Sequence, residues 1–360
     1  MKILYIMSSY NIYGGTPKKT LDLLNYFKKD SSLYVYSDYN KEFKPLFEQT
    51  GASIYEGNYG RNLFKHVSEI LKIIDSRNID ILQTQFSMGE TLGYFIKLLR
   101  PHIKLIVAFV GPFEPQGIKK FIVKQIYKKV DSFVFISEYV KNKKISQFPI
   151  LNEKKSNIIF NGTSLRAITD EEYPKLNHPA LLDVAGLVDW KNIDILVEVI
   201  NIIVNKLLKQ DIYLYIAGDG PERKNLELKI EKYSLGEHIF LLGYQKNIGA
   251  LLEECDIYVH PAYAEGFGIA VAEAMMAAKP TIVSNAGALP ELIERDNKSG
   301  LIVEQSDINA WADAILKLID DKEYAQALGE GARKRAQEEF SIEKYTSNYH
   351  NLYLSLLENR

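Results

Sequence analysis

The 360-residue sequence contains a single cysteine, Cys255. One cysteine excludes an internal disulfide and any cysteine-rich metal site, which favours a reducing, cytoplasmic setting. Long apolar runs are absent too, since stretches such as LIVAFV at 105–110 are far shorter than the roughly 20 residues of a transmembrane helix. The opening residues, MKILYIMSSY, indicate a buried strand followed by a loop rather than a signal peptide.

The chain also has little net charge, because 44 Lys and Arg residues nearly balance 46 Asp and Glu residues. The two halves differ, however. Residues 1–165 contain 24 basic and 14 acidic residues, a net charge of +10, whereas residues 166–360 have a net charge of −12. This asymmetry predicts that the first half faces something anionic.

Short apolar runs alternate with amphipathic stretches along the whole chain, which is typical of parallel α/β units. Strands are expected at 2–7, 33–37, 53–57, 80–85, 104–110, 132–137 and 156–161, and then at 181–187, 212–218, 239–243, 257–261 and 281–285. The polar stretch 166–180 is expected to be a linker. We therefore expect two Rossmann-like, doubly wound domains facing each other across a cleft, at 1–165 and 181–340. A C-terminal helix at 341–360 is expected to pack back toward the first domain.

The nine residues EGFGIAVAE at 265–273 follow an expected strand and continue into an expected helix. Gly266 and Gly268 allow the backbone to approach a ligand closely, and free N–H groups at the helix start form an anion site. Glu265 precedes this site and Glu273 lies more than a turn beyond it. The two carboxylates are therefore expected to bind different parts of one long ligand rather than act together on one bond.

This motif, P-x3-EGFG-x4-E followed by KPTIVSNAGALPELI, resembles the GT4-type retaining glycosyltransferases of the GT-B fold, also known as glycosyl transferases group 1. The resemblance runs through the second half of the chain and is looser in the first half. It also includes WKNIDIL (190–196), YIAGDGPERKNLE (215–227), FLLGY (240–244), GLIVEQSD (300–307), YGGTPKKTLDL (13–23), FISE (135–138) and NG (161–162).

The resemblance implies a role for each matching residue. Glu265 would hold hydroxyls of the transferred sugar, and Lys191 would neutralise the departing diphosphate, so both are assigned as catalytic. Glu273 would hold the ribose of the nucleotide, and Gly15 would contact the diphosphate from the first domain. The backbone N–H groups of five residues would bind the sugar and the diphosphate: Gly266, Phe267, Gly268, Ile269 and Ala270. The backbone between Leu242 and Tyr244 would contact the base.

Four positions depart from the family pattern. Gly186 stands where an Arg is common, Val110 where a His is usual, and Gln83 and Gln85 replace a frequent His pair. Because Gln does not titrate near neutrality, no general base is evident in the first domain, which disfavours an inverting mechanism. The sequence also lacks Asp-x-Asp, the motif of the metal-bridged diphosphate site in the other glycosyltransferase fold, so neither a metal site nor a cofactor is expected.

The resemblance implies a metal-independent, retaining transfer of a hexosyl unit from a nucleotide sugar to a glycan or lipid-linked acceptor, in surface polysaccharide or glycolipid assembly. A second hypothesis is a catalytically weak subunit that binds a glycan or nucleotide sugar and supports a partner enzyme. A third is an epimerase or phosphorylase on the same fold. The sequence does not identify the sugar, the base, the acceptor or the oligomeric state.

A lysine-rich stretch, GIKKFIVKQIYKKV at 117–130, predicts an amphipathic helix in the first domain. Ile118, Phe121, Ile122, Ile126 and Val130 are expected on its apolar side. Five lysines spread around the remainder: Lys119, Lys120, Lys124, Lys128 and Lys129. They are expected to be either a solvated face or a surface for anionic headgroups or a lipid diphosphate, which would place the protein peripherally at the inner face of the membrane. Nucleic acid is not expected as a partner, because no aromatic residues interleave with the lysines as a stacking platform.

Overall fold

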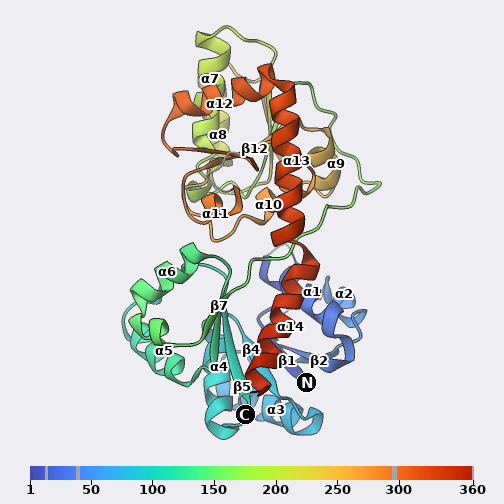
Figure 1. The fold of residues 1–360 in the computed structure, drawn as a ribbon, viewed down its shortest axis with the longest axis vertical. Helices are drawn as coiled ribbons and strands as arrows, with labels where there is room; N and C mark the ends of the chain where they lie inside the picture. The colour runs from blue at the N-terminus through green and yellow to red at the C-terminus, as the bar shows by residue number, and fades with distance from the viewer. Residues whose placement is uncertain (13–14, 38–40, 294–297, 359–360) are drawn as a thin grey trace. The chain divides into compact units, whose positions relative to one another are not determined.

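The structure, a computed structural model, describes residues 1–12, 15–37, 41–293 and 298–358. It divides into two compact units, one formed by residues 1–162 together with 342–360 and the other by residues 163–341 (Figure 1). The segment 166–180, expected to be a linker, lies within the second unit. Tyr13 and Gly14 of the motif at 13–23 lie outside the described residues.

Among the described residues, the first unit contains a seven-stranded parallel sheet in the order β3-β2-β1-β4-β5-β6-β7. Its strands are β1 (Ile3–Met7), β2 (Ser31–Val35), β3 (Ser53–Glu56), β4 (Ile81–Thr84), β5 (Lys104–Phe109), β6 (Ser132–Phe135) and β7 (Ser156–Ile158). Its helices are α1 (Gly15–Phe27), α2 (Lys44–Glu48), α3 (Leu63–Arg77), α4 (Phe86–Leu99), α5 (Ile118–Lys129), α6 (Glu138–Gln147) and α14 (Ile342–Glu358), with 3-10 turns at Lys28–Asp30 and Pro149–Glu153.

The central strands of this sheet are buried on both faces, which explains why they read as continuous apolar runs rather than as an alternation. In register, Ile3 of β1 pairs with Ser31 of β2 on one side and Ile81 of β4 on the other. The strand order reverses at β1 and β4, and ligands of doubly wound sheets bind outside the carboxyl ends of strands near such a point.

The C-terminal helix α14 packs against the first unit beside α1 (red in Figure 1). Its buried face contributes three tyrosines, Tyr345, Tyr349 and Tyr353, to the core around β1. The hydroxyl of Tyr353 lies 3.2 Å from that of Tyr5 and donates to Gln83 Oε1 at 2.5 Å. Gln83 is therefore a hydrogen-bonding partner of α14, a role its sequence position did not indicate.

The second unit contains, within the described residues, a six-stranded parallel sheet in the order β10-β9-β8-β11-β12-β13. Its strands are β8 (Ala180–Val184), β9 (Tyr213–Ala217), β10 (Ile239–Gly243), β11 (Ile257–His260), β12 (Thr281–Ser284) and β13 (Leu301–Val303). Its helices are α7 (Asp194–Asn201), α8 (Arg223–Lys232), α9 (Ile248–Glu254), α10 (Ile269–Met276), α11 (Leu289–Ile293), α12 (Ile308–Asp320) and α13 (Lys322–Glu339), with a 3-10 turn at Asp189–Lys191 and a π turn at Ile202–Lys206. The two parallel sheets confirm the expected fold class.

Among the elements of the second unit that the sequence pattern does not predict are β13 and α13. β13 is only three residues long, and α13 is mostly polar. α13 nevertheless buries small residues, and a Cβ on Gly329 would lie 2.1 Å from the carbonyl oxygen of Ala278, the loop residue after α10. Close packing of small residues holds α13 against α10, and such packing leaves little apolar periodicity to detect.

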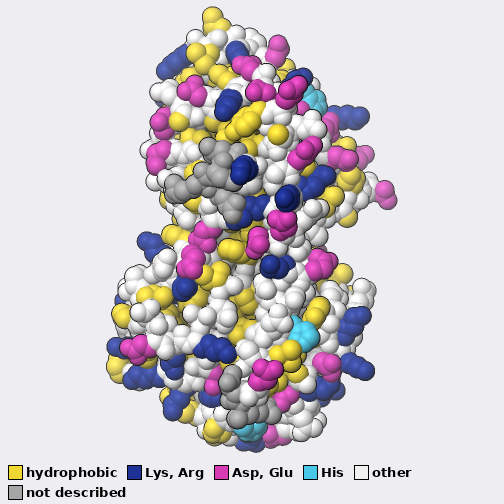
Figure 2. Space-filling view, in the orientation of Figure 1, with side chains coloured by type: hydrophobic (Ala, Val, Ile, Leu, Met, Phe, Trp, Pro, Cys, Tyr) yellow, Lys and Arg dark blue, Asp and Glu magenta, His cyan; other side chains and the backbone are white. Residues whose placement is uncertain are grey.

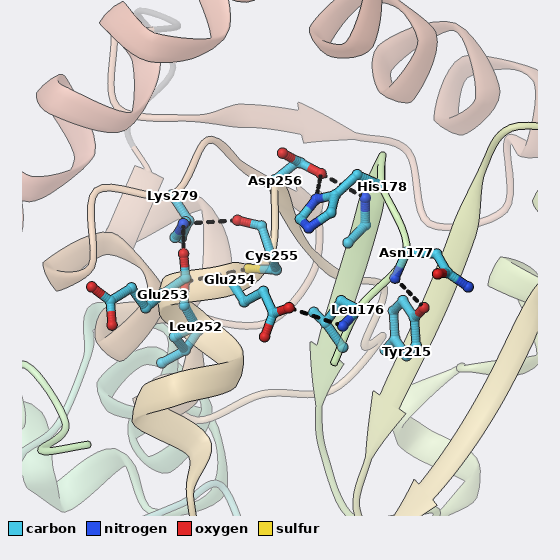
Figure 3. A network of polar contacts seen from close by, with 11 residues as sticks. Leu176, Asn177, His178, Tyr215, Leu252, Glu253, Glu254, Cys255, Asp256 and Lys279 are labelled. Carbon is cyan, nitrogen blue, oxygen red and sulfur yellow. Dashed lines mark hydrogen bonds and ion pairs between the residues drawn. The ribbon is translucent and has the colours of Figure 1, made fainter. Parts of the chain in front are cut away.

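The segment that leads into β8 is fixed by polar contacts to the loop before β11 (Figure 3). Asp256 accepts hydrogen bonds from the backbone N–H of Ala180 and contacts His178 Nδ1, both at 2.7 Å. On the other side of that loop, Lys279 donates to the carbonyl oxygens of Glu253 and Cys255 at 2.7 Å. These contacts set the register of β8 and β11, whose opposite, carboxyl ends carry the candidate site.

Candidate active site

The backbone of the EGFG motif is shaped by two glycines. Gly268, the residue before α10, has a φ of 100°, a conformation that L-residues with side chains rarely adopt. Gly287 has a φ of 58°, and a Cβ there would lie 2.5 Å from the carbonyl oxygen and 2.6 Å from the nitrogen of Glu265. Ala288 N–H then donates to the Glu265 carbonyl at 2.9 Å. The loop after β12 therefore fixes Glu265 in front of α10.

The Glu265 carboxylate is bound on three sides. Its Oε2 forms an ion pair with Lys191 Nζ and lies 3.5 Å from His260 Nε2, and its Oε1 accepts from the Gly266 N–H at 3.2 Å. Burial acts to raise the pKa of Glu265, but His260 and Lys191 outweigh it and lower that pKa to about 2. Glu265 is therefore ionised at neutral pH.

Behind Glu265 lies a buried pair, His260 at the end of β11 and Asp183 in β8. Their Nδ1 and Oδ1 atoms are 2.8 Å apart, and both side chains are at most 1% exposed. Burial disfavours the charged ring, yet the Asp183 charge and the hydrogen bonds to Asp183 and Glu265 raise the pKa of His260. The site is thus a line of contacts from Asp183 through His260 and Glu265 to Lys191, in which the two carboxylates favour the charged form of the His260 ring.

Lys191 is the last residue of the 3-10 turn Asp189–Lys191, and hydrogen bonds fix this turn at both ends. Tyr263 donates its hydroxyl to Asp189 and its N–H to the Trp190 carbonyl, the latter at 3.1 Å. Asn192, with a φ of 53°, donates its amide to the carbonyls of Pro261 and Gln305 at 3.2 Å each. These bonds bring Lys191, which is 74 residues before Glu265 in the sequence, into contact with it.

Glu273 is buried on α10 and forms an ion pair of 2.8 Å with Arg166 Nε. Arg166 belongs to the segment before β8, and its carbonyl lies close enough to Gly249 of α9 to leave no room for a Cβ there. The carboxylate expected to bind a ribose therefore already contacts a guanidinium group.

The other predicted donor-binding positions differ in their environment. Gly266, Ile269 and Ala270 are partly exposed at the start of α10, whereas Phe267 is buried with its ring against that of Phe340. Tyr244 is exposed after β10, and Leu242 is partly buried, with its carbonyl accepting from Gln245. Gly15 is the exposed first residue of α1 in the first unit.

Sequence reasoning missed three residues that shape this site: Asp183, His260 and Arg166. Asp183 and His260 carry a recognisable signal, because each is a polar residue in an otherwise apolar strand, in LLDV and IYVH. Buried polar groups of this kind need a partner, and the pairing of β8 with β11 brings the two together. Arg166 stands in a polar, non-periodic segment and has no such signal.

The apolar side of α5 agrees with the expected one only in part. Ile126 and Val130, which directly follows the helix, are buried as expected, and so are Val123 and Tyr127, whereas Phe121 and Ile122 are 65% and 48% exposed. All five predicted lysines of this helix, Lys119, Lys120, Lys124, Lys128 and Lys129, are exposed. Figure 2 shows Lys and Arg side chains beside hydrophobic ones over α5 and α6. The reason is the rotation of the helix about its axis: Val123 is turned inward, so Phe121 and Ile122 point outward.

In the part of the chain that the structure describes, no group of three His, Cys, Asp or Glu side chains could hold a metal ion. Likewise, none of its helices combines the length and apolar character needed to cross a membrane.

Comparisons with known proteins show which family and fold the chain resembles. Residues 167–335, nearly all of the second unit, match the family model of glycosyl transferases group 1. The uncharacterized glycosyltransferase MJ1178 of Methanocaldococcus jannaschii is 28% identical over 293 residues, 79% of this chain and 78% of that protein. The UDP-Gal:alpha-D-GlcNAc-diphosphoundecaprenol alpha-1,3-galactosyltransferase of Escherichia coli is 25% identical over 314 residues, 82% of this chain and 80% of that protein.

Among solved structures, Anabaena Alr3699/HepE in complex with UDP superimposes with a TM-score of 0.84 at 18% identity, over 99% of this chain and 100% of that one. This likeness concerns the fold. Residues 167–335 of the second unit therefore match the glycosyl transferases group 1 family, and the fold of the chain is that of the GT-B glycosyltransferases.

Proposed function

We propose that the chain is a retaining glycosyltransferase that transfers a hexosyl unit from a nucleotide sugar to a glycan or lipid-linked acceptor. The observation that carries this proposal is the contact between Glu265 and Lys191 in front of the first turn of α10. A carboxylate that accepts from sugar hydroxyls lies here beside two groups suited to a diphosphate, an ammonium and a set of free helix N–H groups.

In this proposal, binding of the donor breaks the ion pair between Glu265 and Lys191, and each residue then binds a different part of the donor. The hydroxyls of the sugar donate to Glu265, and Lys191 turns from Glu265 to the diphosphate. As the glycosidic bond breaks, negative charge grows on the leaving diphosphate, and Lys191 together with the N–H groups of Gly268, Ile269 and Ala270 stabilises it. No divalent ion is assigned to this step.

The remaining donor contacts follow the family positions. The ribose is proposed to bind at Glu273, which requires Arg166 to move away from a carboxylate it now contacts at 2.8 Å. The base is proposed to meet the backbone between Leu242 and Tyr244, and the diphosphate to meet Gly15 as well.

The absence of a base at two family positions supports the proposal of retention. The hydroxyl of Tyr353 binds Gln83, one of the two glutamines at the family's His positions, and Gln is not a base. The leaving diphosphate itself is proposed to accept the acceptor's proton on the same face of the sugar. The Escherichia coli relative, whose name gives a lipid diphosphate acceptor, supports a lipid-linked acceptor for this chain.

Donor hydrolysis tests the proposal without knowledge of the acceptor. Wild type, Glu265→Ala and Lys191→Ala are incubated with a panel of nucleotide sugars, with and without a chelator, and released nucleotide is measured. Release by wild type, unchanged by chelator and lost in both variants, is expected. Full activity in both variants overturns the assigned roles. Calorimetric binding of a donor by wild type without any release would instead identify a binding subunit.

For α5 we propose a peripheral contact with an anionic membrane, in which Lys119, Lys120, Lys124, Lys128 and Lys129 meet the headgroups and Phe121 enters the interface. Each lysine near an anionic surface contributes roughly 1 kcal/mol, and an exposed Phe between lysines suits the boundary between headgroups and acyl chains. Vesicle co-sedimentation of wild type and of Lys119, Lys120, Lys128 and Lys129 changed to Glu provides the test. Binding to anionic vesicles alone, lost in the variant and at high salt, is expected; equal failure to bind anionic and neutral vesicles refutes it.

A further inference from the structure

The first unit contains a cavity that the proposed donor contacts do not use. Its volume is about 390 Å³, within the usual range of small-molecule sites. It lies at the carboxyl end of β5, between the start of α4, the loop after β5, and helices α5 and α6. The lining residues used below are Phe86, Glu90, Phe109, Phe113, Tyr127 and Lys144.

Two charged side chains of opposite sign are buried in the wall of this cavity. Glu90 is 6% exposed and Lys144 is 5% exposed. Tyr127 donates its hydroxyl to Glu90 Oε2 at 3.4 Å, whereas Lys144 donates to the Phe113 carbonyl and lies 4.9 Å from the ring centre of Phe109. Across the described residues, no ion pair joins Glu90 to Lys144, and Glu90 Oε1 accepts no hydrogen bond. Glu90 Oε1 is accessible from the cavity, so a ligand hydroxyl can donate to it there.

The aromatic wall carries a second, independent observation. Phe86, the first residue of α4, has a φ of 63°, a conformation that is a genuine outlier for a bulky side chain and that concentrates at functional sites. Its ring is partly exposed where it lines the cavity, and Phe113 is 78% exposed. A folded chain normally buries such rings, so a cavity edged by two of them favours a ligand with an apolar face.

We propose that this cavity binds one sugar ring of the acceptor, with a ring hydroxyl donating to Glu90 Oε1 and the apolar face of the ring lying on the phenylalanines. The identification as acceptor rests on the proposed function; the sugar-binding chemistry rests on the cavity. An alkyl chain would leave Glu90 Oε1 without a hydrogen-bond donor. An anion would have to approach the Glu90 carboxyl, which disfavours it. The Lys144 ammonium, which could attract an anion, is already bound to the Phe113 carbonyl.

The test measures binding to the full chain without a donor. Saturation-transfer NMR is carried out with methyl glycosides of glucose, galactose and N-acetylglucosamine, and with decanol as an apolar probe. Glu90→Gln removes the charge at the proposed hydroxyl site, and Ser87→Trp fills the cavity from an exposed lining position without altering the core. Glu153→Gln, at an exposed position of the 3-10 turn Pro149–Glu153, is the matched control.

At least one glycoside is expected to bind wild type and Glu153→Gln equally, to bind Glu90→Gln about tenfold more weakly, and to fail to bind Ser87→Trp. Binding of decanol alone, absence of any glycoside binding, or equal glycoside binding by all variants overturns the proposal. Donor hydrolysis by wild type is scored separately. Hydrolysis without glycoside binding refutes the subsite alone, and glycoside binding without hydrolysis of any donor refutes the proposed function alone.

Discussion

Asp183 Oδ1 lies 2.8 Å from His260 Nδ1, and His260 Nε2 in turn lies 3.5 Å from Glu265 Oε2. Asp183 thereby fixes the ring orientation and favours the charged imidazolium. A charged His260, together with Lys191, holds Glu265 ionised, since both contact Oε2. The orientation and charge of the carboxylate assigned to the sugar therefore depend on a residue in another strand that no ligand needs to touch.

Changing Asp183 to Asn tests this dependence. Because the folded-state pKa of His260 is raised above its ordinary value of 6.5, its stabilising charge is fully present below about pH 6.5 and is lost as the pH rises through the folded pKa. Asp183→Asn is expected to lower the free energy of unfolding by about 1–3 kcal/mol at pH 6 and by less at pH 9. Urea unfolding at both pH values measures it. An NMR titration should show a lower His260 pKa in the variant, and an unchanged pKa would contradict the argument.

Changing Glu265 to Gln keeps the shape of the side chain and removes its charge. We expect donor turnover, as kcat/KM, to fall by about 10²- to 10³-fold, the usual effect of losing one preorganised group in an active site. Since the pKa of Glu265 is lowered to about 2, the loss should persist at every pH from 5 to 8. Glu237→Gln, at an exposed position of the same unit, is the control. Loss in both variants would point to a general effect of charge rather than to the site.

Gly287→Ala tests how tightly the loop after β12 fixes Glu265. The new Cβ would lie 2.5 Å from a backbone oxygen of Glu265, and the φ of 58° disfavours any side chain. We expect a loss of about 1–3 kcal/mol in the free energy of unfolding together with reduced donor turnover. Gly236→Ala, whose Cβ would meet nothing within 4 Å, should change neither quantity. Thermal denaturation and the hydrolysis assay measure both, and equal behaviour of the two variants would refute this role.

The sequence was sufficient for the class of fold because parallel strands buried on both faces leave continuous apolar runs, as in KLIVAF of β5 and IYVH of β11. It was insufficient for α13, whose contact face consists of alanine and glycine, and for the face of α5. There, Phe121 and Ile122 fit the same helical stripe as Ile126, but the buried side of the helix runs through Val123, Ile126 and Tyr127. Neighbouring helical positions differ by about 100°, and periodicity alone does not select between two stripes that share a residue.

Only those residues of the candidate site that belong to a short sequence motif could be predicted. Glu265, Gly268 and Glu273 stand within nine residues, and Lys191 was assigned from a resemblance rather than from its own surroundings. The contact between Asp183 and His260 depends on which strands become neighbours, a property of the whole sheet. The same holds for Glu90 and Lys144, which are 54 residues apart and share one cavity.

Glu90 provides a pH-dependent test of that cavity. Burial raises the pKa of Glu90 to about 7, opposed by the charge of Lys144 and the hydrogen bond from Tyr127. A carboxyl whose folded-state pKa exceeds its unfolded value of about 4.5 stabilises the protein fully below that pH, and the contribution is lost as the pH rises through about 7. Between pH 5 and pH 8, the free energy of unfolding of wild type is therefore expected to fall by about 1–3 kcal/mol relative to that of Glu90→Gln. The size follows because each pKa unit corresponds to about 1.4 kcal/mol. Denaturant unfolding of wild type, Glu90→Gln and Glu153→Gln at both pH values measures the difference. A gap between wild type and Glu90→Gln that stays constant with pH, as expected for the Glu153→Gln control, would show that Glu90 titrates as an ordinary surface carboxylate.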